Sequence, residues 1–318
     1  MSTSTVRVLK TSTPPSALSK LVDEWLSDVK AKGSSPRTVD AYRFPVERIF
    51  LPYCAEQGVD APDQITREVL NRLNQRMLDG WSPGGKQLSN ASVRSYLRQI
   101  NVFLAWVKTE KGIGNGTRAK LPKPRKLVVD CLERDEIAKL EGAAGSERDQ
   151  LIVRVLGDAG IRLGELMKLS VDDLVTSPAG WQLRIEGKGD EQRFVPISTP
   201  LAKRLKTYAE KRRPKDATTT RLFVTSRRRR TTGEYVGLSK RGVELMLRSL
   251  ADQAKITKRV YPHVFRHSFA THLLKKGMDP FQVAKVLGHH SLAMLWTTYG
   301  HVVAEDSRKD LAKYLLEE

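Results

Sequence analysis

Apolar residues recur at every third or fourth position near the start of the chain. In residues 16–32 this spacing predicts an amphipathic helix. Ser35 and Pro36 are typical of a second helix start, because serine caps the first N–H groups and proline suits the first turn. The apolar spacing carries this second helix to about Glu56, with a kink or a break expected at Pro45. The chain is therefore predicted to begin with two packed helices.

The same spacing predicts further helices at residues 63–78 and 91–109, which completes a helical N-terminal domain over residues 14–110. Residues 1–13 are rich in serine and threonine and are expected to form a flexible N-terminus. Over residues 111–130, glycine, proline and basic residues replace apolar ones, which predicts a linker. Its basic residues leave two interpretations open, a segment that lies along a phosphate backbone and a solvated tether.

The remaining residues, 131–318, mix two periodicities. The short alternating segments 181–186 and 192–197 are separated by a glycine-containing turn, which predicts a β-hairpin. A further short strand is expected at residues 221–225. Helical spacing appears at residues 133–142, 147–157, 163–169, 240–254, 263–276, 281–287 and 307–316. The predicted fold class is mainly α with a small antiparallel β-sheet, divided into a helical N-terminal domain and a mixed α/β C-terminal domain.

The charge of the chain points to a polyanionic partner. Its 318 residues include 55 Lys and Arg against 36 Asp and Glu, a formal net charge of +19 at pH 7. A surplus of this size repels itself and is typical of a protein that binds nucleic acid. A membrane partner is not expected, because the sequence has neither a basic amphipathic helix with an aromatic apolar face nor an apolar run long enough to span a bilayer.

The N-terminal residues and the cysteines indicate the compartment. The N-terminus lacks the hydrophobic core of a secretion signal. Cys54 and Cys131 are far apart in the sequence and in no metal-ligand spacing, so both are expected to be small buried or half-buried residues and not a disulfide. We therefore expect the reducing cytoplasm, with association with the nucleoid when the protein is bound to DNA.

All six histidines lie between His263 and His301, which favours a metal site or a catalytic site. His263 and His267 are one turn apart on a predicted helix, a spacing that could hold a metal. However, the residues between them include Arg266 and no glutamate base, and a guanidinium would repel a metal cation. We expect no metal and no other cofactor.

The same segment offers donors for a phosphate group. His263 and Arg266 share a helix face, and arginine can fork two hydrogen bonds onto phosphate oxygens. Arg162 follows a glycine at the start of a predicted helix, and Lys188 lies between two glycines at the tip of the predicted hairpin. Each of these cations alone is more often a solvated charge. Together they indicate a site that binds phosphate.

Four blocks of the sequence resemble those of the tyrosine recombinase family, which includes the phage integrases and the Xer-type recombinases. In the order of that family they are Gly160–Leu166 with Arg162, Lys188 in a strand–turn–strand unit, His263–His272 with Arg266, and Leu287–His289 followed by Tyr299–His301. The helical N-terminal domain also resembles the core-binding domain of the family. The resemblance thus covers residues 14–318 and implies that residues 131–318 form a tyrosine-recombinase catalytic domain.

The resemblance implies a role for each of these residues. Tyr299 would attack the scissile phosphate and become linked to the 3′ phosphate, which conserves the phosphodiester energy so that rejoining needs no ATP. Arg162 and Arg266 would hold the non-bridging oxygens as charge builds up on them. Lys188 would protonate the departing 5′ oxygen, and His263 would be the acid–base histidine near the tyrosine.

A second histidine, His289, is implied to hydrogen-bond the phosphate. The neighbouring His290, however, has the spacing to Tyr299 that is common in the family, so either histidine could fill this place. We favour His289 because Gly288 precedes it, as the family pattern expects.

Other residues near these blocks are expected to have supporting roles. Glu165 lies one turn from Arg162 and could hold its guanidinium or stabilise the local fold. His267, His272 and His301 are interpreted as structural histidines, although His301 has the position that usually follows the tyrosine in the family.

Two basic or amphipathic segments have alternative interpretations. The run of four arginines at residues 227–230 could contact phosphates without sequence preference or form a solvated loop. The amphipathic segment 307–316 could pack on its own domain. In relatives, however, the tail after the tyrosine docks on a neighbouring subunit, and we favour that exchange.

The resemblance implies a site-specific recombinase whose two domains clamp double-stranded DNA. A homo-tetramer on synapsed sites would exchange strands through a Holliday junction, in integration, excision or resolution, with accessory directionality or host factors as further partners. Two alternatives remain, a type IB topoisomerase-like nicking–closing enzyme with a similar residue set and a catalytically idle DNA-binding protein.

Overall fold

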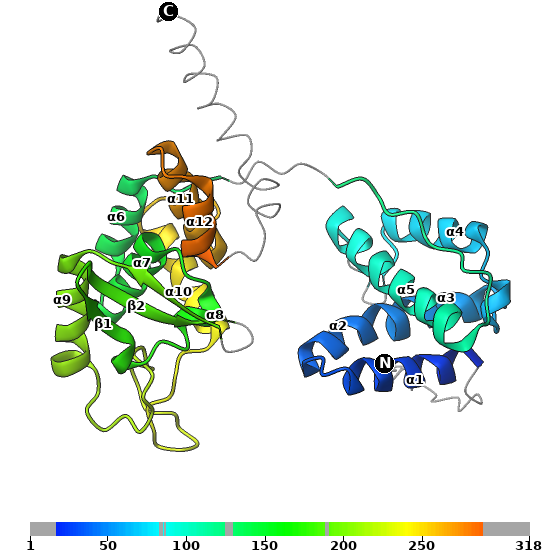
Figure 1. Ribbon diagram of the computed structural model, residues 1–318, viewed down its shortest axis with the longest axis horizontal. Helices are drawn as coiled ribbons and strands as arrows, with labels where there is room; N and C mark the ends of the chain where they lie inside the picture. The colour runs from blue at the N-terminus through cyan, green and yellow to red at the C-terminus, as the bar shows by residue number, and fades with distance from the viewer. Residues whose placement is uncertain (1–16, 83–84, 86, 125–129, 188–190, 289–318) are drawn as a thin grey trace, which may run out of the picture. The chain divides into compact units, whose positions relative to one another are not determined.

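The computed structural model describes residues 17–82, 85, 87–124, 130–187 and 191–288 of the chain. It divides the chain into two compact units, Met1–Leu127 and Val128–Glu318 (Figure 1). No helix in the described ranges is both long and apolar enough to cross a membrane.

The described part of the first unit is helical. Its helices are α1 (Ala17–Ala31), α2 (Pro36–Pro45), α3 (Leu51–Glu56), α4 (Arg67–Leu78) and α5 (Asn90–Lys111), with a short 3₁₀ turn at Pro62–Gln64. Ser35 Oγ accepts a hydrogen bond from Thr38 N at 3.2 Å, which confirms the predicted N-cap. Pro45 ends α2, and a π-helical turn at Val46–Phe50 leads into α3, as expected for a proline that lacks an N–H.

Aromatic side chains hold these helices together. Trp25 of α1 packs on Phe103 of α5 with ring centroids 5.2 Å apart, and Phe50 meets the same ring at 6.3 Å. All three side chains are fully buried. Trp106 Nε1 also donates to Asp28 at 2.9 Å, which fixes α1 along α5.

Residues 112–122 belong to the first unit. Ala119 N donates to Asn101 Oδ1 at 2.7 Å, and Asn101 Nδ2 donates back to Ala119 O at 2.9 Å. Asn115 Nδ2 donates to Ile65 O at 2.9 Å, and Ala119 is buried in the core. This part of the predicted linker is therefore attached to the first unit, because asparagine side chains satisfy some of its backbone groups, while most of its residues are exposed.

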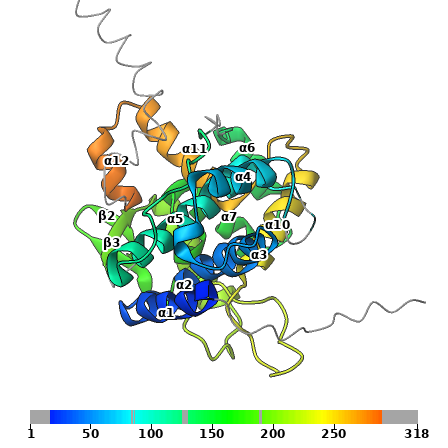
Figure 2. The ribbon, with the colours of Figure 1, turned by 90° about the vertical axis from the view of Figure 1, so that its right-hand side faces the viewer.

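The second unit combines helices with one small sheet. Its helices are α6 (Arg134–Ala143), α7 (Glu147–Ala159), α8 (Leu163–Leu166), α9 (Thr199–Thr207), α10 (Lys240–Gln253), α11 (Pro262–Lys275) and α12 (Pro280–Leu287). The strands β1 (Leu174–Ser177), β2 (Gly180–Glu186) and β3 (Gln192–Pro196) form an antiparallel sheet in that order. Helices α11 and α12 lie side by side at one end of the unit (Figures 1 and 2). The predicted fold class is confirmed.

Two elements of the second unit, β1 and α9, are not among those predicted from the sequence. Strand β1 pairs Leu174 with Leu183 of β2, but its four residues are too few to show a period. Helix α9 begins at the N-cap Ser198, whose Oγ accepts from Leu201 N at 3.4 Å. The capping signal is thus present in the sequence, and the missed element is an error of interpretation.

The strand expected at residues 221–225 is not formed. The segment makes only isolated bridges, one between Ser170 and Arg221 and one between Val224 and Gly237. Leu222, Phe223 and Val224 are buried, and the first two belong to the core of the unit, so the composition of a strand occurs here without a strand partner.

The expected burial of the cysteines is confirmed. Cys54 is buried in the first unit, Cys131 is half-buried in the second, and neither forms a disulfide. Burial raises the pKa of the Cys54 thiol to about 12.

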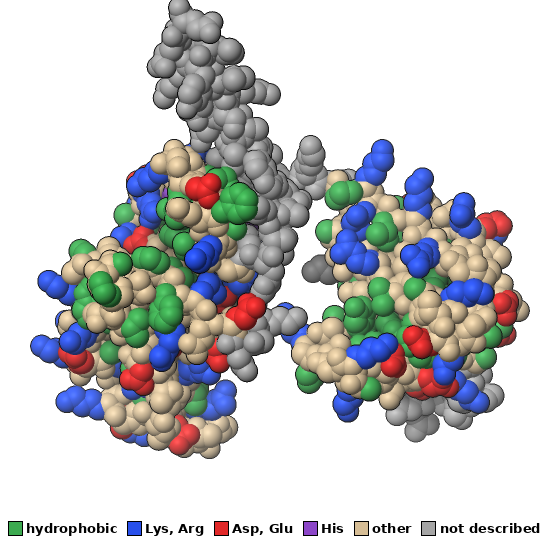
Figure 3. Space-filling model, in the orientation of Figure 1, with side chains coloured by type: hydrophobic (Ala, Val, Ile, Leu, Met, Phe, Trp, Pro, Cys, Tyr) green, Lys and Arg blue, Asp and Glu red, His purple; other side chains and the backbone are tan. Residues whose placement is uncertain are grey.

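Positive side chains dominate the charged surface visible in Figure 3. The four-arginine run at residues 227–230 is exposed. Within it, Arg228 forms an ion pair with Asp216 and lies 5.3 Å from the ring centroid of Tyr235. The structure therefore shows a basic surface loop at this run, and one of its four cations is already paired.

Glycine at position 160 is required where α7 ends. Its φ is +58°, and a Cβ at this position would overlap the Phe269 ring of α11. We expect Gly160→Ala to lower the free energy of unfolding of the second unit by roughly 2–4 kcal/mol, from left-handed strain and overpacking. Denaturant unfolding would measure it. Gly164→Ala is the control, because nothing lies within 4 Å of its Cβ position; an equal loss there would contradict the explanation.

Candidate active site

The structure brings together three of the predicted site residues. Arg162 is the N-cap of α8, directly after the turn that ends α7, and His263 and Arg266 lie on the first turns of α11. Arg266 Nη1 donates to Gly160 O at 3.0 Å, which ties α11 to that turn. The other predicted site residues, Lys188, His289 and Tyr299, lie outside the described residues, as does His290.

Glu165 lies at the centre of this group. Its carboxylate accepts from Arg162 N at 2.7 Å and from Arg162 Nη1 at 2.8 Å, so it caps α8 and holds the guanidinium. Arg193 of β3 donates to both oxygens, at 3.1 and 2.8 Å. Burial alone would raise the pKa of Glu165, but hydrogen bonds from Arg193 and Arg162 hold it below its usual value. Glu165 is therefore an anion that orients two cations.

The C-terminal end of α12 receives three arginines. Each of its last carbonyls accepts a hydrogen bond from a different guanidinium, at 3.0, 2.7 and 3.1 Å. The acceptors are Val286, Leu287 and Gly288, and the respective donors are Arg193, Arg266 and Arg162. The last carbonyls of a helix lack intrahelical donors and lie at the negative end of its dipole, which suits cations.

Arg266 is almost enclosed. Only 6% of Arg266 is exposed, and its two terminal nitrogens donate to the backbone carbonyls of Gly160 and Leu287. Arg162 is more open, with a side chain 38% exposed. Backbone carbonyls thus fix the guanidinium of Arg266, and the guanidinium of Arg162 is more accessible to solvent.

His263 lies on an exposed position of α11, beside these cations. Burial, and then the charges of Arg266 and Arg162, lower its pKa below the ordinary value of 6.5. His263 is therefore neutral at pH 7 and able to accept a proton. The pKa of His267 is lowered in the same way, by burial, His263 and Arg266.

This arrangement can bind and polarise a phosphodiester. Two arginines and a neutral histidine converge on one place, with Glu165 and backbone carbonyls fixing the guanidinium planes. A profile of the phage integrase family matches residues 131–306, more than half of the chain. The chain belongs to the phage integrase family.

Curated relatives in this family match the chain over nearly its whole length. The tyrosine recombinase XerD of Staphylococcus epidermidis is 29% identical over 303 residues, which cover 92% of this chain and 97% of the relative. A tyrosine recombinase of Thermosipho africanus is 30% identical over 302 residues, 92% of this chain and 99% of the relative. The resemblance to tyrosine recombinases is confirmed.

Solved structures share the fold. XerH site-specific recombinase bound to its difH substrate in a pre-cleavage complex has a TM-score of 0.65 at 20% identity, covering 89% of this chain and 81% of that one. The Tn1549 transposon integrase in complex with transposon right end DNA has a TM-score of 0.69 at 16% identity, covering 92% and 98%. A lambda integrase tetramer bound to a Holliday junction has a TM-score of 0.60 at 18% identity, covering 86% and 77%.

Sequence reasoning missed Arg193, which touches Glu165 and α12. One signal could have found it. In the alternating strand 192–196, Arg193 has the same parity as the buried Val195 and faces inward with it. An inward-facing arginine needs a buried acid, and Glu165 was available in the family motif.

Two of the histidines interpreted as structural lie among the described residues. His267 is half-buried, and His272 is buried with its Nε2 3.6 Å from Glu133 Oε2. His301 lies outside the described residues. Among the residues that the structure describes, no group of three or more histidines, cysteines and acids could hold a metal ion.

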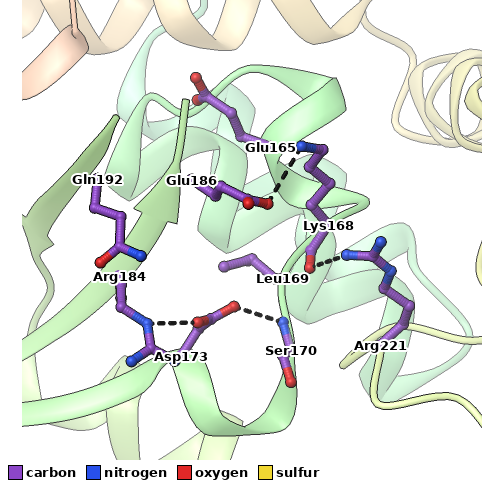
Figure 4. A pocket seen from close by; sticks show the side chains of 9 residues that line it. All are labelled: Glu165, Lys168, Leu169, Ser170, Asp173, Arg184, Glu186, Gln192 and Arg221. Carbon is purple, nitrogen blue, oxygen red and sulfur yellow. Dashed lines mark hydrogen bonds and ion pairs between the residues drawn. The ribbon is translucent and has the colours of Figure 1, made fainter. Parts of the chain in front are cut away.

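A polar pocket of about 400 Å³ lies beside Glu165, between α8 and the sheet (Figure 4). Lys168 pairs with Glu186 at 3.2 Å across it, and Arg184 Nε pairs with Asp173 at 3.0 Å. Its lining residues are Glu165, Lys168, Leu169, Ser170, Asp173, Arg184, Glu186, Gln192 and Arg221. Most of the charged side chains that line the pocket thus pair with one another. We interpret these ion pairs as structural contacts between the hairpin and the residues around α8.

Proposed function

We propose that this chain is a site-specific DNA recombinase that cleaves and rejoins strands through a 3′-phosphotyrosyl intermediate. The observation that carries the proposal is the convergence of Arg162, Arg266 and His263, with the arginines held in place by Glu165 and backbone carbonyls. Such preorganised donors stabilise the charge that develops on a phosphoryl group in the transition state.

In the proposed reaction, the Tyr299 oxygen bonds to phosphorus while the bond from phosphorus to the 5′ oxygen breaks. His263 accepts the phenolic proton, and Lys188 gives a proton to the departing 5′ oxygen. Arg162 and Arg266 bind the non-bridging oxygens, with His289 as a further donor. Rejoining is the reverse, with a 5′ hydroxyl as the nucleophile, so neither ATP nor a metal is used.

The partner is double-stranded DNA, with the first unit acting as a core-binding domain. We propose a homo-tetramer on two synapsed sites, supported by the lambda integrase relative that was solved as a tetramer on a Holliday junction. Accessory directionality or host factors would act on this assembly. The cytoplasm, at the nucleoid, is the place where such a substrate is found.

The proposal is tested by trapping the covalent complex. The full chain is incubated in EDTA and without ATP with nicked DNA from its genomic neighbourhood, and a protein–DNA adduct that survives denaturation is expected. Four-way junctions should form when two sites are present. Adducts without junctions would favour a nicking–closing enzyme, and binding without adducts would favour a catalytically idle protein.

The lowered pKa of His263 is expected to set the acidic limb of the pH–rate profile of cleavage. A neutral imidazole is required as the base, so single-turnover cleavage should fall as the pH drops through this pKa, below 6.5. His263→Gln should be slower at pH 7 and should lose that limb, as measured by adduct formation between pH 5 and 8. His267→Gln is the matched control and should keep the limb; its loss there would assign the titration to His267.

A further inference from the structure

We infer that Arg193 is a positioning residue for DNA cleavage. It fixes Glu165 and the C-terminal end of α12, and these in turn set the guanidinium groups of Arg162 and Arg266. The inference rests on the proposed function, because it concerns how the same phosphate-binding arginines are aimed.

Arg193 joins two separate elements of the second unit. Its Nη1 and Nη2 donate to the two oxygens of Glu165, and its Nε donates to Val286 O at 3.0 Å. The side chain is only 15% exposed. A planar guanidinium bonded on both edges in this way has one orientation, which a lysine cannot reproduce.

The contact of Arg193 with α12 links it indirectly to Arg162 and Arg266. A Cβ added at Gly288 would lie 3.2 Å from three atoms of the Arg193 side chain, so the last turn of α12 rests on it. The neighbouring carbonyls of Leu287 and Gly288 are acceptors for Arg266 and Arg162. Without Arg193, Val286 O loses its donor, and the turn that aims both guanidinium groups loses its support.

The contact with Glu165 controls how strongly Arg162 is held. The carboxylate is 7% exposed, so its charge is poorly screened. With Arg193 present, the charge of Glu165 is shared between two cations. Without Arg193, it would act on Arg162 alone, draw that guanidinium inward and reduce its interaction with a phosphate.

Arg193 also lies in the hairpin of β2 and β3, and Lys188 lies between these two strands in the sequence. The partner of Arg193 across the hairpin is Ile185, and Gly187 N donates to Glu191 O at 2.7 Å closer to the turn. Arg193 therefore connects the hairpin to Glu165 and to the C-terminal end of α12. Lys188 itself lies outside the described residues.

A half-buried arginine can also serve stability alone, and Arg204 is an example. Its Nε donates to Glu147 at 3.1 Å and its Nη2 to Gln150 at 3.2 Å, joining α9 to α7. Its Nη1 also donates to Glu141, and none of these three partners contacts Arg162, His263 or Arg266 in the hydrogen bonds of the described residues. Arg204→Gln is therefore the matched control for a purely structural arginine.

The experiment compares two versions of a DNA site on which the wild type forms its adduct. One has a normal scissile phosphate, and the other has a methylphosphonate, in which a neutral methyl group replaces a charged non-bridging oxygen. Arg193→Gln should slow single-turnover cleavage of the phosphate about 10- to 100-fold, because the clamping arginines are misplaced. Cleavage of the methylphosphonate, which needs less positive charge, should change much less.

The ratio of the two rates separates positioning from stability. Arg204→Gln should lower the unfolding temperature and leave that ratio at its wild-type value. Equal slowing of both substrates by Arg193→Gln, or no slowing, would overturn the inference. If Arg193→Gln does not fold, Arg193→Lys replaces it, because lysine keeps the charge without the forked geometry. A lowered ratio of phosphate to methylphosphonate cleavage in Arg193→Lys would support the positioning role, and a wild-type ratio would overturn it. Absence of any wild-type adduct would instead count against the proposed function.

Discussion

Tyr299→Phe is expected to abolish the denaturation-resistant protein–DNA adduct while DNA binding is retained. The substitution removes only the phenolic oxygen, which is the atom proposed to bond to phosphorus. Loss of the nucleophile from a covalent mechanism typically reduces the rate on the order of 10⁶-fold, below detection in a gel assay. Adduct formation on nicked DNA and binding by mobility shift, measured on the same samples, would check both parts.

Tyr261→Phe is a matched control for this result. Tyr261 precedes α11 as its N-cap and is also a tyrosine close in sequence to His263, but its hydroxyl makes no capping hydrogen bond. The variant should form the adduct at the wild-type rate. An adduct that persists in Tyr299→Phe, or one mapped by peptide analysis to another residue, would show that Tyr299 is not the nucleophile.

Periodicity predicted the long helices well because each buries one apolar stripe. The helices with Trp25 and Phe103, for example, appear where the spacing placed them. Periodicity failed for elements too short to show a period and for a segment whose composition resembles that of a strand. Strand β1 has only four residues, and residues 221–225 look like a strand but lack a partner over their length. Packing of residues 112–122 depends on single asparagine side chains, which have no period to detect.

The site shows a different limit. The motifs named Arg162, His263 and Arg266, and the structure brings them together across about a hundred residues of sequence. The hydrogen bonds that orient the two guanidinium groups could not be predicted from the motifs. Their acceptors are the backbone carbonyls of Leu287 and Gly288, which no side chain marks in the sequence. Arg193 shows an inward-facing position in the strand pattern, but the identity of its partner, Glu165, follows only from the fold.

Arg266→Gln is expected to reduce cleavage by about 10³- to 10⁵-fold, the range for removing an arginine that stabilises phosphoryl charge. DNA binding should weaken far less, because a protein of net charge +19 has many other cations that can contact DNA phosphates. The buried carbonyls of Gly160 and Leu287 would also lose charged donors, at a cost of roughly 1–3 kcal/mol in the free energy of unfolding. Single-turnover adduct formation and denaturant unfolding would measure the two effects.

The two effects can be separated by a control arginine. Arg154 of α7 pairs with Asp158 at 2.8 Å on a partly exposed surface and has no hydrogen bond to the site among the described residues. Arg154→Gln should leave cleavage near the wild-type rate. Since Arg266→Gln combines a lost charge with lost support for α12, restoring the folded population with an osmolyte should not restore its activity. Recovery of cleavage under those conditions would mean that Arg266 acts through stability and not through the phosphate.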